Sequence, residues 1–287
     1  ANFQDSTFMW NGADNYSVEF LESYLRSNDI LHFSFKYGDF APSFCSFRNP
    51  NTISTILVTH IQKEELDLSC LDTFHGVSAM DLGSNEIGTY LNGCEKLGNV
   101  VLNMPKLATL HLWNNDLSLC SKDLFHNIGK LSMYIEYLDI GRNNIDGQTC
   151  EYVASTLVNL TKLKVVGMHH NKYVSDKCCK RLAHAFEKLH SLEFLYLEHN
   201  QITDDGVASI ISSLTELQHL EKVRFSSNNI TDIGVKYLAH ALPNMSSSLR
   251  SMTFYDNNIT GAGEAYMKRA WENAGKDPRL FNRNAHS

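Results

Sequence analysis

The sequence lacks the features that mark membrane-spanning and nucleic-acid-binding proteins. It contains no apolar run that approaches the ~18 residues needed to cross a bilayer. Its 25 Lys and Arg residues are outnumbered by 32 Asp and Glu residues, which gives a formal net charge of −7. A chain with this balance offers no basic footprint for phosphate backbones. We therefore predict neither a membrane span nor a nucleic-acid partner.

Motifs for catalysis are also missing. The sequence holds no G-x-S-x-G nucleophile turn, no G-x-x-x-x-G-K-S/T phosphate loop and no H-E-x-x-H metal pair. We expect no enzymatic activity, no cofactor and no bound metal.

Signs of a disulfide framework are weak as well. The seven cysteines form an odd number and show no paired spacing. We therefore expect reduced cysteines and a cytoplasmic protein, with a secreted effector that acts in a host cell as the alternative. Five N-x-S/T glycosylation motifs oppose this expectation, and they begin at Asn15, Asn159, Asn229, Asn244 and Asn258.

What the sequence does contain is a repeat. The phrase L-x-x-L-x-L-x-x-N-x-I, with conservative replacements, first occurs at residues 77–87 and returns six more times. The spacing of its asparagines stays between 28 residues, as from 115 to 143, and 30 residues, as from 85 to 115. A fixed period of this kind is typical of solenoid proteins. We assign a structural role to each of these asparagines: Asn85, Asn115, Asn143, Asn171, Asn200, Asn228 and Asn257.

A second phrase, I-T-x-x-G-x-x-x-L, follows some of the asparagines, at residues 202–210, 230–238 and 259–267. Together the two phrases resemble the leucine-rich repeat, and in particular its ribonuclease-inhibitor-like subfamily, over about residues 77–270. The resemblance implies an α/β fold. We expect a right-handed horseshoe solenoid with a concave parallel β-sheet and convex α-helices.

The repeat predicts which side chains are buried. Side chains alternate between the two faces of a strand, so the strand leucines, such as Leu110, Leu138 and Leu195, should enter the core. The residues between them should lie on the outer face of the sheet. The asparagine side chain should satisfy backbone groups of the turn that follows, and Thr203 should cap the next helix.

The repeat also divides the chain. We predict an N-terminal cap with degenerate repeats over residues 1–76, with a helix from Asp14 to Ser27. Seven regular repeats follow over residues 77–260. A C-terminal capping helix and a polar tail complete the chain over residues 261–287, and the tail from Lys276 onward should lack ordered structure.

Outward-facing residues carry no core function, so they indicate where a partner binds. Aromatic side chains on a rigid sheet are enriched at binding hot spots, and acidic neighbours favour a partner that carries Lys or Arg. The alternative is that these aromatics only cover neighbouring strands. We predict a protein-binding concave face made of Trp113, Tyr137, Asp139, His169, Phe194, Tyr196, Glu198, Arg224 and Tyr255.

A possible zinc site lies on the same face. The pairs His169-His170 and Glu198-His199 occupy equivalent places in adjacent repeats, where imidazole and carboxylate groups suit zinc. The alternative, which we prefer, is that these are solvated surface histidines just before the asparagine turn, and we predict no metal.

The leading hypothesis is a monomeric, non-enzymatic scaffold for protein–protein interaction. It includes an adaptor, the sensing module of an innate-immune receptor and a microbial effector. The alternative is a GTPase-activating protein of the Ran type, because the resembled subfamily includes such activators. They use an arginine near a strand-end loop, where this chain has Arg142.

Overall fold

The computed structural model describes residues 2–4, 7–10, 17–38, 43–61, 66–120, 122–131 and 133–281. The chain forms two compact units, Ala1–Asp139 and Ile140–Ser287. None of the described helices is long and apolar enough to cross a membrane.

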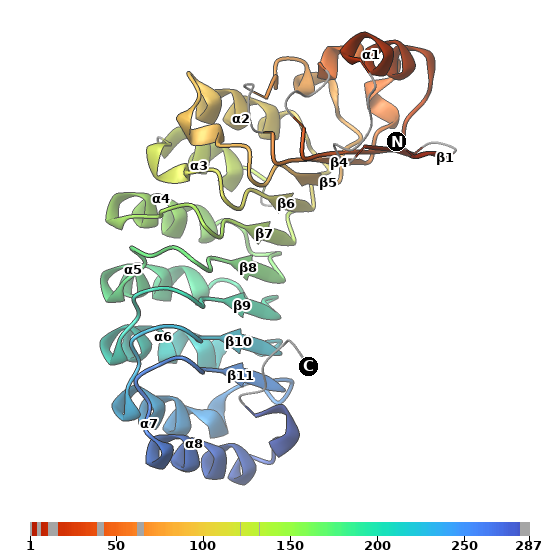
Figure 1. Cartoon of the computed structure of the whole chain (residues 1–287). Helices are drawn as coiled ribbons and strands as arrows, with labels where there is room; N and C mark the ends of the chain where they lie inside the picture. The colour runs from red at the N-terminus through yellow and green to blue at the C-terminus, as the bar shows by residue number, and fades with distance from the viewer. Residues whose placement is uncertain are drawn as a thin grey trace. The chain divides into compact units, whose positions relative to one another are not determined.

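Unit 1 is built from short strands that alternate with helices or single 3₁₀ turns (Figure 1). Its strands are β1 (Asn2–Gln4), β2 (Thr7–Trp10), β3 (His32–Lys36), β4 (Thr55–Thr59), β5 (Ala79–Asp81), β6 (Thr109–His111) and β7 (Tyr137–Asp139). Its α-helices are α1 (Val18–Ser27), α2 (Gly93–Leu102) and α3 (Lys122–Gly129). The 3₁₀ turns are η1 (Phe44–Ser46), η2 (Pro50–Thr52), η3 (Leu71–Thr73), η4 (Ile87–Thr89) and η5 (Leu117–Leu119). The β1–β2 pair is antiparallel, and the pairs from β2 to β7 are parallel.

Unit 2 is more regular, with one strand and one helix in each repeat. Its strands are β8 (Val165–Gly167), β9 (Phe194–Tyr196), β10 (Lys222–Arg224) and β11 (Ser251–Thr253), and they pair in parallel. Its helices are α4 (Gly147–Leu157), α5 (Asp176–Phe186), α6 (Asp204–Glu216), α7 (Asp232–Ala241) and α8 (Gly261–Asn273), with 3₁₀ turns η6 (Leu242–Asn244) and η7 (Pro278–Leu280). In Figure 1 the helices of this unit stack on one side of its strands. The predicted α/β leucine-rich-repeat solenoid is thereby confirmed.

The predicted strand register is also confirmed. Leu110 and Leu195 are 0% exposed and Leu138 is 2% exposed. The intervening Tyr137 and Phe194 are half-buried on the opposite face. Alternation along the strand therefore separates core positions from surface positions, as the spacing of the leucines requires.

The asparagines form a hydrogen-bonded ladder between repeats. Asn171 is fully buried, and its Nδ2 donates to the carbonyls of Ile140 (3.1 Å) and Met168 (3.0 Å). Its Oδ1 accepts from the backbone N–H groups of Asn143 (2.8 Å) and Ile145 (3.2 Å). One amide side chain thus satisfies four backbone groups that the turn would otherwise bury unpaired.

A second ladder explains the I-T-x-x-G phrase. The carboxylate of Asp204, in the first turn of α6, accepts from the backbone N–H (2.8 Å) and the hydroxyl (2.6 Å) of Thr231 in the next repeat. It also accepts from the N–H of Gly234 at 2.8 Å. A Cβ atom on Gly234 would overlap this carboxylate. Glycine at that position is therefore required by the close approach of the preceding repeat.

Two predictions concern the ends of the chain, the helix near the N-terminus and the tail at the C-terminus. Helix α1 begins at Val18, with the Ser17 hydroxyl accepting from the N–H of Phe20 at 3.2 Å; residues 14–16 of the predicted helix lie outside the described residues. The prediction that the tail lacks order from Lys276 onward is wrong for its first residues. Phe281 pairs with β11 and packs on Phe254, with ring centroids 5.4 Å apart. Residues 282–287 lie outside the described residues. The proposed domain boundaries at 76 and 260 stay a prediction.

The expectation of unpaired cysteines is wrong. Six cysteines form three disulfides, with Cα–Cα distances of 5.1, 5.4 and 5.8 Å. Each bond joins residues 25, 26 or 28 positions apart, so it links one repeat to the next. Stacking of repeats brings such residues within the reach of a disulfide. The pairs are Cys45–Cys70, Cys94–Cys120 and Cys150–Cys178.

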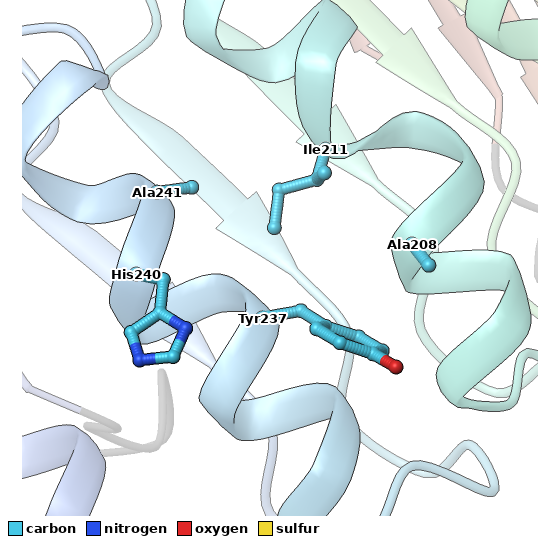
Figure 2. A pocket seen from close by; sticks show the side chains of 5 residues that line it. All are labelled: Ala208, Ile211, Tyr237, His240 and Ala241. Atoms are coloured by element: carbon cyan, nitrogen blue, oxygen red, sulfur yellow. The ribbon is translucent and has the colours of Figure 1, made fainter.

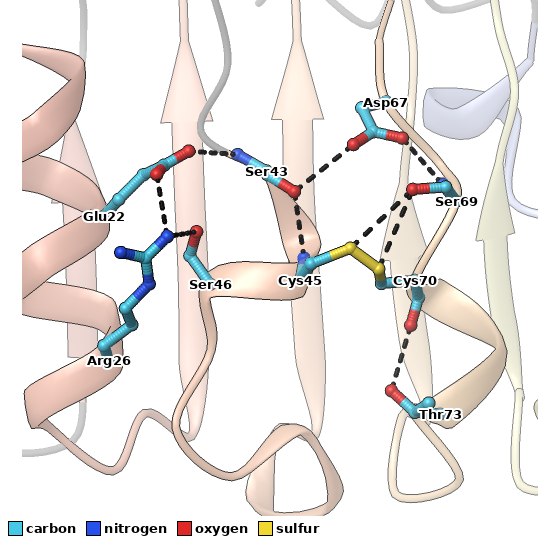
Figure 3. The surroundings of a disulfide bond; sticks show 9 residues. All are labelled: Glu22, Arg26, Ser43, Cys45, Ser46, Asp67, Ser69, Cys70 and Thr73. Atoms are coloured by element: carbon cyan, nitrogen blue, oxygen red, sulfur yellow. Dashed lines mark hydrogen bonds and ion pairs between the residues drawn. A yellow bond between two sulfur atoms is a disulfide. The ribbon is translucent and has the colours of Figure 1, made fainter.

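Figure 3 shows the surroundings of the first disulfide. The Ser43 hydroxyl accepts from the N–H of Cys45 at 3.2 Å and donates to Asp67 at 3.2 Å. The Ser43–Asp67 hydrogen bond and the disulfide therefore join the same two repeats. The remaining cysteine, Cys179, is free and buried, and burial raises the pKa of its thiol to about 12.

Candidate functional site

The sheet face is the surface of the strands that is turned away from the helices. In unit 2 the strand register places Tyr196 on β9, Arg224 on β10 and Thr253 on β11 in one row. Two residues before Tyr196 and Arg224 on the same two strands, Phe194 and Lys222 also lie side by side. Neighbouring strands are about 4.8 Å apart, so side chains within a row are in reach of one another.

Arg224 links the aromatic and acidic residues of unit 2. Its guanidinium carbon lies 4.6 Å from the centroid of the Tyr196 ring, a cation–π arrangement. Its Nη1 lies 3.4 Å from Oε1 of Glu198. The ring of Phe194 is 6.4 Å from that of Tyr196. These contacts hold the side chains of four predicted site residues in a defined arrangement.

Histidines lie next to this cluster, at the ends of the strands. The ring of His169 lies over Gly141, where a Cβ atom would overlap it. The rings of His170 and His199 are stacked at 3.8 Å. Burial lowers the pKa of His170 to about 4, with the nearby His199, Arg142 and His169 adding to the effect. His170 is therefore neutral at pH 7.

No group of three or more His, Cys, Asp or Glu side chains within the described parts of the chain is arranged to hold a metal ion. His170 and His199, one from each of the two pairs that suggested zinc in the sequence, pack ring against ring. Stacking of the imidazoles accounts for their proximity.

In unit 1 the aromatic residues pack on their neighbours. The ring of Trp113 lies over Gly83 and 5.4 Å from the ring of His60. Tyr137 is stacked on His111 at 4.5 Å, and Nδ1 of that histidine is 3.9 Å from the carboxylate of Asp139. Tyr137 and Asp139 therefore meet His111 on the adjacent strand, and Trp113 meets residues of the preceding repeats.

The predicted site residues are divided between the two units. Trp113, Tyr137 and Asp139 belong to unit 1, and the other six belong to unit 2. Asp139 is nearly buried, at 9% exposure, whereas the aromatic members are half-buried. These aromatics both cover their neighbours and keep an exposed part.

Sequence reasoning predicted Glu198 but missed two other polar residues of the sheet face, Ser226 and Thr253. Oε2 of Glu198, Oγ of Ser226 and Oγ1 of Thr253 are buried and have no hydrogen-bond partner among the described residues. In the sequence, small polar residues at outward positions resemble solvent-facing ones, so they attract no notice. Their register with Arg224 is the signal that could have identified them.

A shallow pocket lies on the helix side of unit 2, between α6 and α7 (Figure 2). It has a volume of about 300 Å³. The ring of His240 lies 3.2 Å from the hydroxyl of Tyr266 on α8. The pocket is lined by Ala208, Ile211, Tyr237, His240 and Ala241.

Comparison with known proteins supports the repeat assignment. The sequence matches the family model described as "Leucine Rich repeat" over residues 188–210 and 216–239. It is 28% identical over 123 residues to NACHT, LRR and PYD domains-containing protein 14 of Homo sapiens, covering 42% of this chain and 11% of that protein. It is 24% identical over 215 residues to NACHT, LRR and PYD domains-containing protein 9 of Bos taurus, covering 55% of this chain and 22% of that protein. The chain thus spans at most about a fifth of these relatives.

Two further similarities cover more of the chain. Osteomodulin of Rattus norvegicus is 26% identical over 217 residues, covering 70% of this chain and 48% of that protein. The crystal structure of the leucine-rich repeat-containing protein LegL7 of Legionella pneumophila superposes with a TM-score of 0.50 and 13% identity. That match covers 94% of this chain and 98% of the other. The chain thus matches leucine-rich repeats over residues 188–210 and 216–239, and it folds as an α/β leucine-rich-repeat solenoid.

Proposed function

We propose that the chain is a non-enzymatic protein-interaction module that binds a protein partner on its sheet face. The observation that carries this proposal is the half-exposed Phe194–Tyr196–Arg224 cluster, whose members are held by mutual contacts. Tyr and Arg are enriched among binding hot spots. Side chains that are already ordered lose little conformational entropy when a partner docks.

Among the scaffold hypotheses, we favour the sensing module of a larger innate-immune receptor. The supporting observation is similarity to proteins named for NACHT, LRR and PYD domains, of which the matched part is 11% in one and 22% in another. A free-standing adaptor and a microbial effector are the other two hypotheses. We also propose membership of the ribonuclease-inhibitor-like subfamily, because each repeat of unit 2 carries an α-helix of 10 to 13 residues.

The GTPase-activating alternative depends on Arg142. This residue is exposed, has a positive φ of 56° and lies 3.4 Å from the His170 ring nitrogen. Other residues at the equivalent place, such as His199 and Asp256, also have a positive φ, so the conformation belongs to the repeat. The backbone conformation of Arg142 therefore gives no support to a catalytic role, and we prefer the scaffold proposal.

Two locations are proposed for the protein, the cytoplasm and, as the alternative, secretion from the cell. The cytoplasmic proposal agrees with the NACHT-containing relatives. The three disulfides favour the alternative, a chain that folds in an oxidising compartment and is secreted. Such bonds are rare in the reducing cytosol, so the redox state of the cysteines in the source cells discriminates between the two.

Partner capture tests the proposed face. The immobilised chain is incubated with an extract of the source cells, and bound proteins are identified by mass spectrometry. Tyr196→Ala should reduce the free energy of partner binding by about 2 kcal/mol or more, the loss expected for a hot spot. Less of the partner should then be captured. Lys236→Ala, on the exposed side of α7, is the matched control and should bind as the wild type does.

Equal thermal unfolding curves establish that both variants fold. Loss of binding in Lys236→Ala but not in Tyr196→Ala would move the site to the helix side. Equal retention by all three proteins would reject the sheet face as the binding surface.

A further inference from the structure

One oxygen of the Glu198 carboxylate, on the sheet face of unit 2, is already paired with Arg224. Glu198 lies 3.4 Å from the guanidinium of Arg224, and its side chain is only 14% exposed. Glu221, just before β10, forms an ion pair with Arg250. A partner that carries Lys or Arg would have to compete with these two arginines for each carboxylate. Glu198, one of the acidic residues that favour a basic partner in the sequence, is therefore already partly neutralised by Arg224.

Lys222 is a second positive charge on this surface, beside Arg224. It lies on β10, on the same face as Arg224, and no carboxylate among the described residues lies within 4.0 Å of its ammonium group. Burial lowers its pKa, and the positive charges of Arg224 and Arg250 lower it further, against the opposing effect of Glu221. An incoming negative charge would stabilise an ammonium group in this position. It would supply a counter-ion and offset the repulsion from Arg224 and Arg250.

Two buried hydroxyls lie in the adjoining positions. Ser226 follows Arg224 by two residues on the same side of the chain, and Thr253 pairs with Arg224 across to β11. They are 1% and 4% exposed, and their oxygens have no partner among the described residues. A hydroxyl can donate to a carboxylate. Two hydroxyls beside Arg224 are therefore without a hydrogen-bond partner among the described residues and could donate to an incoming carboxylate.

Apolar surface flanks these donors on one side. The strand register places Phe194 beside Lys222 and Tyr196 beside Arg224. Both aromatic side chains are half-buried and so keep an exposed part. A ligand that places a carboxylate over β10 would lay its neighbouring groups against the aromatic rings of β9.

We infer that this surface binds an acidic segment of the protein partner, with an Asp or Glu carboxylate between Lys222 and Arg224 and an apolar residue of the same segment against Phe194 and Tyr196. The inference rests on the proposed function and names the chemistry of the partner. The net charge of −7 on the whole chain does not oppose it, because exposed charges more than about 8 Å away are largely screened at physiological salt.

Three sets of immobilised peptides test this inference directly. The sets share random apolar and aromatic positions and differ only in a central pair, which is Asp/Glu, Asn/Gln or Lys/Arg. Labelled full-length chain should bind the acidic set at least about tenfold more tightly than the amide set, the equivalent of one good ion pair. The preference should shrink between about 0.15 M and about 1 M salt.

A matched pair of variants locates the contact. Lys222→Gln should remove most of the acidic preference, whereas Lys236→Gln on α7 should retain it. The comparison of the three peptide sets uses the wild-type chain alone, so it stays decisive even if Lys222→Gln does not fold.

Equal binding of the acidic and amide sets, or stronger binding of the basic set, would overturn the inference. If that binding were still lost in Tyr196→Ala, the proposed function would stand without it. Failure of all three sets to bind would also overturn the inference, and partner capture from the cell extract would then decide the proposed function separately.

Discussion

Replacement of Asn200 by alanine tests the structural role of the repeat asparagines. Its Nδ2 donates to the carbonyls of Met168 (3.1 Å) and Leu197 (2.9 Å), and its Oδ1 accepts from the N–H of Asn171 (2.8 Å). The substitution removes all three bonds. Its cost depends on which of the three backbone groups then has no partner.

The two carbonyls keep other donors. Met168 still accepts from Nδ2 of Asn171 at 3.0 Å, and Leu197 still accepts from Nδ2 of Asn228 at 2.9 Å. The buried N–H of Asn171 has no second acceptor among the described residues. One orphaned buried donor costs about 1–3 kcal/mol, and we expect Asn200→Ala to lower the free energy of unfolding by that amount.

Urea unfolding followed by circular dichroism measures this difference, provided that the m-value is unchanged. The control is Gln201→Ala, which truncates the exposed neighbouring side chain and should change stability by at most about 0.5 kcal/mol. Equal losses for Asn200→Ala and Gln201→Ala would refute the hydrogen-bonding role of the asparagine ladder.

Four further perturbations have defined outcomes. Leu195→Ala should cost about 2–5 kcal/mol by urea unfolding, because the side chain is 0% exposed in a packed core. Gly234→Ala should be destabilising, since its Cβ would meet the carboxylate of the preceding repeat, whereas Gly261→Ala has free space and should be tolerated. Stability should fall as the pH is lowered from about 6.5 toward 4, because the unfolded chain binds a proton that folded His170, with a pKa of about 4, does not; His170→Gln should flatten this slope. Alkylation of the unfolded, unreduced chain should modify Cys179 alone, and mass spectrometry should detect more labelled cysteines only after reduction.

The sequence by itself determined the local structure of each repeat. Apolar residues at strand spacing placed Leu195 in the core, because a change of face would expose it to water. Thr203 was predicted as a helix cap from its position before two aspartates, and its side chain accepts from the N–H of Asp205 at 3.3 Å. Such features depend on residues close together in the chain, so one repeat contains the information that defines them.

Only the tertiary structure decided which residues of different repeats meet. The sequence indicated that Glu198 is a free acidic group, whereas the structure pairs it with Arg224 of the next strand. Cys150 and Cys178 form a disulfide because stacking brings their Cα atoms to 5.8 Å. The sequence gives the period of the repeats but not the lateral distances between side chains of neighbouring repeats. Those distances set the pairing of charges and thiols, and with it the chemistry of the sheet face.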